Sequence, residues 1–235
     1  MKSLKIYGLM LAGAFALAAC ESAPKSDDAK TGDAQKVDES KANEAQSLKV
    51  DLASSSVTWV GTKPTGKHNG TFNLSDGALS VKGNEVVGGK FTIDINTLKV
   101  LDIPAEDESN GKLTKHLKSP DFFDVEKFPT ATFEVVSVEA FKADATKNEE
   151  KDKEYVLENP THTITGNLTL KGVSKSITFP AIVKVDDGKV DAEAKFNINR
   201  NDWGMEYGTD EAKLKDKFIR PTVHIGFKIS AAAAQ

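Results

Sequence analysis

Four histidines and one cysteine are the side chains of this 235-residue chain that could most readily hold a metal ion. The histidines are His68, His116, His162 and His224, and no two of them stand at the i, i+2 or HExxH spacing of a metal site. Cys20 is the only cysteine, so an intramolecular disulfide and a Cys-based zinc site are both excluded. The pattern predicts that the protein holds no metal.

Groups suited to acid–base or nucleophilic catalysis are equally scattered. Ser119 lies near His116 in sequence, but no GxSxG elbow surrounds it and no third group completes a triad. Acidic pairs such as Asp121 and Asp124 are abundant, yet nothing in the pattern places two of them in an apolar cleft, as acid and base chemistry would need. We therefore predict that the protein is not an enzyme.

Two polar side chains stand among large apolar ones and could contact the polar group of a ligand. His116 lies beside two leucines, where it could hydrogen-bond a carbonyl or phosphate oxygen, or could stabilise the C-terminus of a helix through the dipole. Arg200 could bind a phosphate with two hydrogen bonds, or could tie a strand end to its neighbour. Trp203 could stack on a ligand, or could seal the base of a barrel.

These residues must be positioned by the elements around an aromatic-rich stretch, KHLKSPDFFDVEKFPTATF, at residues 115–133. Leu113 and Leu117 stand at i and i+4, which predicts a short helix near 111–118 that ends before a proline. The residues after the second proline are mostly β-branched or aromatic, which predicts a strand. Because the stretch is too apolar for a solvated loop, we expect it to cover something hydrophobic.

Alternation of apolar and polar residues predicts antiparallel strands from residue 48 onward. Every second residue is apolar in the run 190–198 and again in the last strand, 222–229. Asp76-Gly77 predicts a hairpin turn. About eight strands, each with one apolar face, and no long helix predict an all-β fold, either a sandwich or a closed barrel.

The residues expected to face inward are of two sizes. They are three alanines and four phenylalanines: Ala181, Ala192, Ala194, Phe91, Phe133, Phe179 and Phe196. Small inward residues leave volume and aromatic residues shape its walls, so one interpretation is a cavity for an apolar ligand. The other is a tightly packed core in which alanines pair with bulky residues. The residues alone support both equally.

The two ends of the chain differ in composition from its centre. Residues 1–19 have two lysines, a short apolar run and a small-residue cleavage site before Cys20, which resembles a bacterial lipoprotein signal; the alternative is an ordinary signal peptide. Residues 20–47 are almost all small or charged, which predicts a disordered tether, with a helical stalk as the alternative. At the other end, residues 231–235 should form a C-terminal tail.

One internal segment, 142–159, is densely charged, which predicts an exposed excursion from the fold.

The net charge argues against nucleic acid as a partner, and the signal pattern predicts where in the cell the protein is located. The formal net charge is −4, and an acidic chain without a basic run argues against binding to nucleic acid. We expect an exported protein that is held on the cell-envelope membrane through a lipid on Cys20. In a Gram-negative host this would be the periplasmic side of the outer membrane.

Three stretches carry a resemblance to a known family. They are 115–133, GNLTLKGVSKSITF at 166–179 and NRNDWG at 199–204, in the same order and spacing. Together they resemble the signature of the YceI-like family of polyisoprenoid-binding proteins, over roughly residues 48–230. The resemblance implies one lipocalin-like antiparallel β-barrel that binds a polyprenyl, quinone or fatty chain non-covalently and needs no cofactor. It is also compatible with a homodimer.

The resemblance further implies an apolar tunnel in which the protein sequesters or transports the ligand's polyprenyl or fatty chain. The predicted tunnel residues are Trp59, Phe91, Ile93, Leu113, Leu117, Phe122, Phe123, Phe133, Leu168, Phe179, Ala192, Ala194, Phe196 and Trp203. His116 and Arg200 are the predicted contacts of a polar head group. The alternative function is a solid barrel without a ligand, which would act as a protein-interaction module or an envelope stress lipoprotein.

Overall fold

The computed structural model describes residues 22–40, 44–143 and 151–233. The predicted signal peptide 1–19 and the predicted lipidation site Cys20 lie outside the described residues. The strands are β1 (Lys30–Asp33), β2 (Gln46–Val50), β3 (Ser56–Lys63), β4 (Gly66–Lys82), β5 (Glu85–Val100), β6 (Thr130–Ala140), β7 (His162–Leu170), β8 (Val173–Asp186), β9 (Lys189–Asn199) and β10 (Thr222–Ala232). The helical segments are α2 (Glu108–Lys118), η1 (Lys153–Tyr155), η2 (Arg200–Trp203), α3 (Glu211–Leu214) and η3 (Lys215–Lys217).

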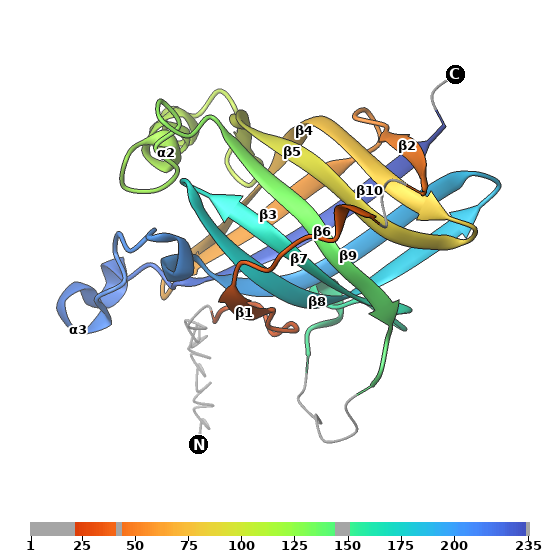
Figure 1. Ribbon diagram of the computed structural model, residues 1–235. Coiled ribbons are helices and arrows are strands. Elements are labelled where there is room, and N and C mark those ends of the chain that lie inside the picture. The colour runs from red at the N-terminus through yellow and green to blue at the C-terminus, as the bar shows by residue number, and fades with distance from the viewer. Residues whose placement is uncertain (1–21, 41–43, 144–150, 234–235) are drawn as a thin grey trace, which may run out of the picture.

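Strands β3 to β10 form a closed antiparallel barrel (Figure 1). Each strand pairs with the next one along the chain, and β10 pairs with β3 from Val223↔Gly61 to Lys228↔Ser56, which closes the ring. Apolar side chains on the inner face of these strands form a single core. The structure thus confirms the predicted single lipocalin-like antiparallel barrel of about eight strands.

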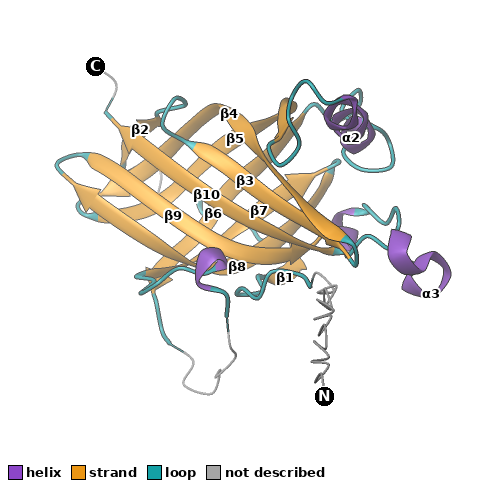
Figure 2. Cartoon of the chain, turned by 180° about the vertical axis from the view of Figure 1, so that it is seen from behind, coloured by secondary structure: helices purple, strands orange, loops and turns teal. Residues whose placement is uncertain are grey.

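The two ends of the barrel are built differently. The connections β3–β4, β5–β6, β7–β8 and β9–β10 gather at one end, which carries α2 and α3 and which we call the mouth end (Figure 2). At the opposite, far end, β2 pairs with both β4 and β10. None of the helices in the described ranges has the length and apolar character needed to cross a membrane.

Helix α2 confirms the predicted short helix and begins three residues earlier than expected. The side chain of Asp107 caps it by accepting a hydrogen bond from the Ser109 N–H at 2.8 Å. Lys115, His116 and Lys118 lie in its last turn, where cations complement the helix dipole. The helix ends at Lys118, and Ser119 is extended because the following proline disfavours a helical backbone there.

The predicted hairpin at Asp76-Gly77 is wrong, because β4 runs through both residues. A Cβ added to Gly77 would lie 2.9 Å from Phe91 Cβ and from Val50 Cγ2, so glycine lets two side chains approach the middle of a strand. The register between β4 and β5 shifts just before this point, as at a β-bulge. The turn instead follows at Gly83, whose φ is 62°.

Residues 24–35, which we call the strap, belong to the barrel wall, contrary to the predicted disordered tether. Strands β8 and β9 pair only from Asp186↔Lys189 to Ala181↔Ala194 and are not paired toward the mouth end. The strap fills this seam (Figure 1). Within it, β1 pairs antiparallel with β8, and the N–H of Ala29 donates to the carbonyl of Asn197 on β9 at 2.9 Å.

Two buried asparagines hold the ends of the strap. The amide of Asn197 donates to the carbonyl of Pro24 at 2.9 Å. The amide of Asn167 donates to the carbonyl of Gln35 at 2.7 Å and accepts from the N–H of Gln35 at 2.9 Å. Composition predicted disorder because the strap has few apolar side chains, but backbone pairing and two side-chain amides hold it instead.

The described part of segment 142–159 packs against the strap, so the predicted exposed excursion holds only in part. The N–H of Asp152 donates to the carbonyl of Lys25 at 2.9 Å, and the hydroxyl of Ser26 donates to the carbonyl of Tyr155. Residues 144–150 lie outside the described residues. The predicted C-terminal tail also needs correction, because β10 extends to Ala232 and pairs there with β2.

We predict that Asn167→Ala loosens the C-terminal half of the strap. The substitution leaves two backbone groups of Gln35 without their partners, so we expect the free energy of unfolding to fall by about 1–3 kcal/mol. Urea denaturation measures the loss, and trypsin should cut faster after Lys36. The control is Asn73→Ala, an exposed strand position, where the change should stay within about 0.5 kcal/mol. Equal losses of unfolding free energy in the two variants would show that Asn167 does not hold the strap.

A second prediction concerns His224, which lies outside the cavity wall, is 4 % exposed and bonds the amide oxygen of Asn197 at 3.1 Å. The ring of Tyr155 covers it, and burial, with Lys195 nearby, lowers the pKa of His224 to about 4. Between the ordinary pKa of about 6.5 and this value, the unfolded chain binds a proton that the folded chain does not. Folding stability should therefore fall by about 3 kcal/mol from pH 6.5 to pH 4.

Urea unfolding at several pH values measures this loss. The variant His224→Gln should flatten the pH dependence, whereas His162→Gln should leave it as it is, because His162 is not buried. Parallel pH profiles for the wild type and His224→Gln would rule out His224 as the titrating group.

Candidate ligand-binding site

An apolar cavity of about 350 Å³ occupies the half of the barrel nearer the mouth end. Its volume falls within the range of about 300–1,000 Å³ that is typical of small-molecule sites. Alternate residues of the barrel strands form its wall, because successive side chains of a strand point to opposite faces. The aromatic turn after α2 covers part of its upper end. The cavity is therefore a property of the barrel together with its mouth connections.

A layer of five phenylalanines forms the floor of the cavity. They are Phe91, Phe133, Phe179, Phe196 and Phe227. The rings of Phe179 and Phe196 stack with centroids 4.1 Å apart, and Phe227 meets Phe179 edge-on at 5.7 Å. Beyond this layer, toward the far end, aliphatic side chains fill the barrel and leave a void of only about 30 Å³. The barrel is thus hollow on one side of the layer and packed on the other.

The roof of the cavity comes from α2 and the turn that follows it. Leu113 and Leu117 lie half-buried on the face of α2 that packs against the core. Phe122 is 7 % exposed, and Phe123 meets Phe72 of β4 edge-on at 5.4 Å. The aromatic stretch, which the sequence predicts to cover something hydrophobic, lies over the cavity.

His116 joins the two largest mouth connections. Its ring meets Tyr207 of the β9–β10 connection edge-on at 4.9 Å and Phe122 at 5.2 Å. Its Nε2 lies 3.0 Å from Oδ2 of Asp121. His116 stands both in the last turn of α2 and in the lining of the cavity, so its two sequence interpretations describe the same position.

Arg200 is a buried cation at the upper end of the cavity. It is 3 % exposed, and its guanidinium donates to the carbonyls of Met205, of Tyr207 at 2.7 Å and of Ile219 at 3.1 Å. The guanidinium carbon Cζ of Arg200 lies 5.4 Å from the ring centroid of Phe122. Burial lowers the pKa of Arg200 to about 10, so the group stays protonated at neutral pH. Carbonyl dipoles, not a carboxylate, are the hydrogen-bond partners of this charge.

Further polar side chains line the cavity near the mouth. They are Lys63, His68 and Arg220. His68 Nδ1 lies 2.8 Å from Oδ2 of Asp102. Burial disfavours the charged form of Asp102, but hydrogen bonds from the Asn69 N–H and from His68 outweigh it and lower its pKa. The polar atoms of the cavity thus gather at its open end, whereas its floor is apolar.

Most predicted tunnel residues line the cavity. Those that do are Trp59, Phe91, Ile93, Leu113, Leu117, Phe122, Phe123, Phe133, Leu168, Phe179 and Phe196, together with His116 and Arg200. The structure brings all of them together although they come from distant parts of the chain. Within the described ranges, His, Cys, Asp and Glu side chains form no group of three that could hold a metal ion.

Ala192, Ala194 and Trp203 do not line the cavity, which corrects the predicted lining. Ala194 lies opposite Phe227 and Ala192 opposite Ile229, so each alanine makes room for a bulky partner on β10. Trp203 is fully buried, and its indole N–H donates to the carbonyl of Leu168 at 3.0 Å. Of the alternatives for these residues, tight packing and sealing describe their positions.

Several residues of the cavity lining are not among those predicted from the sequence. Val57, Phe72 and Ile95 alternate with polar neighbours along their strands, so extending the two-residue period to every strand would have found them. Met205 and Ile219 come from the β9–β10 connection, where no periodicity exists. Arg200 holds that connection over the cavity by hydrogen bonds to its backbone carbonyls. No pattern in the sequence predicts these bonds.

Comparisons with known proteins give a family match. A family model described as "YceI-like domain" matches residues 48–231. A UPF0312 protein of Pseudomonas aeruginosa (strain LESB58) is 36 % identical over 112 residues, which are 48 % of this chain and 47 % of that protein. A UPF0312 protein of Azotobacter vinelandii is 32 % identical over 147 residues, which are 63 % of this chain and 61 % of that protein. The chain thus matches about half to three-fifths of these curated relatives.

Two solved structures share the fold. The crystal structure of BcnA from Burkholderia cenocepacia has a TM-score of 0.54 and 23 % identity, and the match covers 78 % of this chain and 99 % of that one. A polyisoprenoid binding domain from Saccharophagus degradans, implicated in plant cell wall breakdown, has a TM-score of 0.52 and 19 % identity, with 80 % and 98 % covered. At these identities the likeness concerns the barrel fold alone.

We predict that Arg200→Lys loosens the β9–β10 connection. A single ammonium cannot reach the carbonyls of Met205, Tyr207 and Ile219 together, so the free energy of unfolding should fall by about 2–4 kcal/mol. Urea denaturation measures this loss. The control is Arg220→Lys, which should lose less because Arg220 is half-buried whereas Arg200 is almost fully buried. Equal losses would mean that Arg200 does not organise the connection.

Proposed function

The chain belongs to the YceI-like family, and from that premise we propose that its barrel binds one long apolar chain of the polyisoprenoid or fatty class. The apolar chain of the ligand would enter the barrel at the mouth end and extend toward the phenylalanine floor. The binding is non-covalent, and the protein sequesters or carries its ligand without changing it. No cofactor takes part.

One observation carries this proposal: the cavity is apolar throughout its depth and polar only at its open end. A hydrocarbon chain gains about 0.8 kcal/mol for each CH₂ group that leaves water, so a dozen such groups contribute about 10 kcal/mol. This is of the same order as the free energy lost when a free molecule is immobilised, about 4–15 kcal/mol. A chain of a dozen or more carbons can therefore offset this cost, whereas a short one cannot.

The polar end of the ligand would lie near His116 and Arg200. The guanidinium of Arg200 is held by neutral carbonyls, so an oxygen-rich or anionic head group at the mouth would complement its charge. His116 offers a ring nitrogen at the same end of the cavity. Both residues support a ligand with one polar end, such as a prenyl phosphate, a quinone or a fatty acid.

The proposed place of action is the cell envelope. Residues 1–19 have the pattern of a signal that directs export, and Cys20 would then carry a lipid that anchors the protein to the membrane. A membrane is also where long prenyl and fatty chains are found. The proposed role is thus that of a membrane-anchored carrier or store for such chains.

Native mass spectrometry of the protein isolated from its own envelope in mild detergent tests the binding. We expect an additional mass that organic solvent releases and that fragments as a prenyl or fatty chain. The variant Ala131→Phe should lose this mass, because the side chain of Ala131 lines the cavity. The neighbouring Thr132→Phe should keep it, because its side chain points out of the barrel.

Thermal unfolding of both variants confirms that each is folded. A ligand-free mass for the wild type, with no uptake of added quinone, prenyl phosphate or fatty acid, would contradict the proposal. Retention of the ligand by Ala131→Phe would place the ligand outside the cavity.

A further inference from the structure

We propose that the mouth end of the barrel docks on the surface of a lipid bilayer, so that the cavity opens directly onto lipid. The inference deepens the proposed function and rests on it for the anchor at Cys20. It adds the orientation of the barrel and the source of the ligand. Two separate sets of residues support it: those that fix where the chain reaches the barrel, and those exposed around the mouth.

The strap fixes the point at which the N-terminal part of the chain meets the barrel. Ser22 and Pro24 line one hollow on the outer wall together with Thr62 and Lys67. Thr62 pairs with Lys67 and is one residue from the mouth end of β3. The carbonyl of Pro24 is held by Asn197, which is two residues from the mouth end of β9. The first described residue therefore lies beside the mouth.

This position limits the distance between the barrel and the proposed anchor. Ser22 follows Cys20 by two residues, which span at most about 7 Å even when fully extended. A free tether over residues 20–47 would instead have allowed a distance of about 30 Å. Because the strap is bound to the wall, a lipid on Cys20 would hold the rim of the mouth close to the bilayer.

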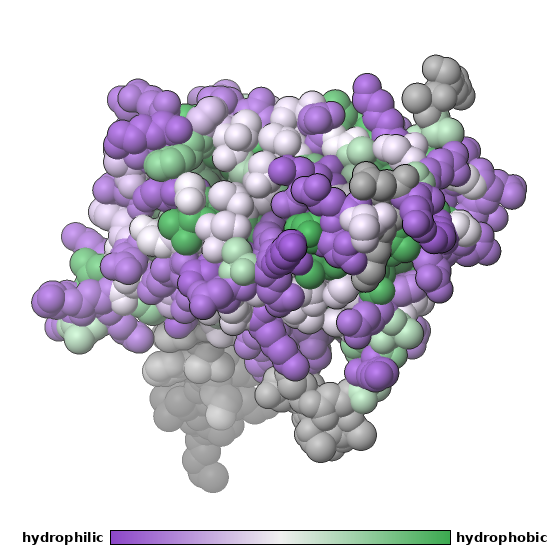
Figure 3. Space-filling view, viewed as in Figure 1, coloured by the Kyte–Doolittle hydropathy of each residue, from purple (hydrophilic) through white to green (hydrophobic). Residues whose placement is uncertain are grey.

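The most exposed large apolar side chains concentrate at the same end. Leu101 is 58 % exposed at the start of the β5–β6 connection, Tyr207 is 46 % exposed in the β9–β10 connection, and Val173 is 38 % exposed where β8 begins. The remaining one in the described residues, Leu52, is 38 % exposed at the far end. Apolar patches interrupt the polar surface around α2 and α3, and further ones lie on the barrel wall away from the mouth (Figure 3). Three mouth connections thus present an apolar tip.

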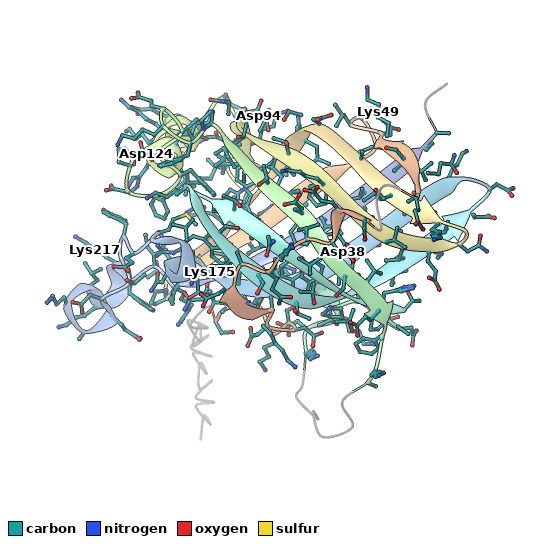
Figure 4. The ribbon with its side chains drawn as sticks, viewed as in Figure 1. Asp38, Lys49, Asp94, Asp124, Lys175 and Lys217 are labelled. Atoms are coloured by element: carbon teal, nitrogen blue, oxygen red, sulfur yellow. The ribbon has the colours of Figure 1, made fainter. Side chains whose placement is uncertain are left out.

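Basic side chains accompany these tips. Lys63 ends β3, Lys171 lies in the β7–β8 turn, and Lys217 lies at the outer edge of the mouth end (Figure 4). Such lysines favour a surface of anionic lipid head groups. Acidic residues such as Glu206 and Asp210 stand in the same connections, so the apolar tips and the position of Ser22 carry the proposal, and charge assists it.

The docking gives the ligand a path that avoids water. With the mouth on the bilayer, a chain could pass from the lipid into the cavity while its polar end stays at the interface, near His116 and Arg200. A barrel that faced away from the membrane would have to take its ligand from solution, where such chains are poorly soluble. The proposed source of the ligand is therefore the bilayer itself.

Lysine labelling of the full lipidated protein tests the orientation without any substitution. The protein is reconstituted on vesicles of phosphatidylethanolamine and phosphatidylglycerol and treated with a membrane-impermeant acetylating reagent. We expect Lys171 and Lys217 to be labelled several-fold less than in detergent micelles. Lys49 and Lys184, at the far end, should be labelled equally in both. Equal labelling of all four, or protection of the far end, would overturn the proposal.

Substitutions at the rim test the apolar tips. In Leu101→Glu and Val173→Glu, the transfer of a fluorescent prenyl probe from vesicles to the barrel should slow several-fold. The matched control is Leu52→Glu, an apolar residue exposed at the far end, which should transfer the probe at the wild-type rate. If the rim variants also transfer at that rate, the mouth does not meet the lipid.

Two measurements separate failure of the docking from failure of the proposed function. Affinity for the probe in detergent micelles should be the same in all three variants, because none of these residues lines the cavity. If the wild-type protein does not bind the probe in micelles, the proposed ligand binding itself is contradicted. The intact mass reports the lipid on Cys20. Without that lipid the proposed anchor fails, and vesicle sedimentation of the variants then decides whether the apolar rim binds bilayers alone.

Discussion

Closure of the barrel wall between β8 and β9 is the requirement on which much of this structure depends. The two strands pair at the far end and part toward the mouth, which leaves backbone donors and acceptors that must find other partners. The strap supplies them through β1, which pairs with β8, and through Asp27 and Ala29, which bond the backbone of Asn197 on β9. Trp203 fills the space inside and bonds the carbonyl of Leu168. Without these two insertions, the mouth half of the barrel would open along its side.

The cavity lies in the same half of the barrel as this gap between β8 and β9. Aliphatic side chains fill the far half, and the alanines of β9 stand there opposite bulky residues of β10. The phenylalanine layer marks the change from packed to hollow. Arg200 then ties the β9–β10 connection over the hollow half through backbone carbonyls. Shape and polarity thus vary together along one axis.

Sequence reasoning recovered the parts of the fold that leave a periodic pattern. Alternating residues revealed the strands, and paired leucines before a proline revealed α2. It failed where a contact is made by the backbone. The strap has few apolar side chains and is held by Asn167 and Asn197, which are far away in sequence. Gly77 looked like a turn because glycine serves both turns and close approaches within a strand. The lining was predicted correctly for most aromatic residues, whose bulk reveals them, but Phe72 was missed, and Trp203, Ala192 and Ala194 were wrongly included.

The register of the strap also has a consequence for the order of folding. Lys30 pairs with Thr178, and Pro24 is bound by Asn197, so the earliest described residues wait for partners that are synthesised far later. Contacts between such distant residues form slowly, because a long loop must close first. Until then, the half-formed barrel presents two bare strand edges, which could accept the strap of another copy. The step that completes the wall is therefore also the step at which two newly made chains are most exposed to strand exchange.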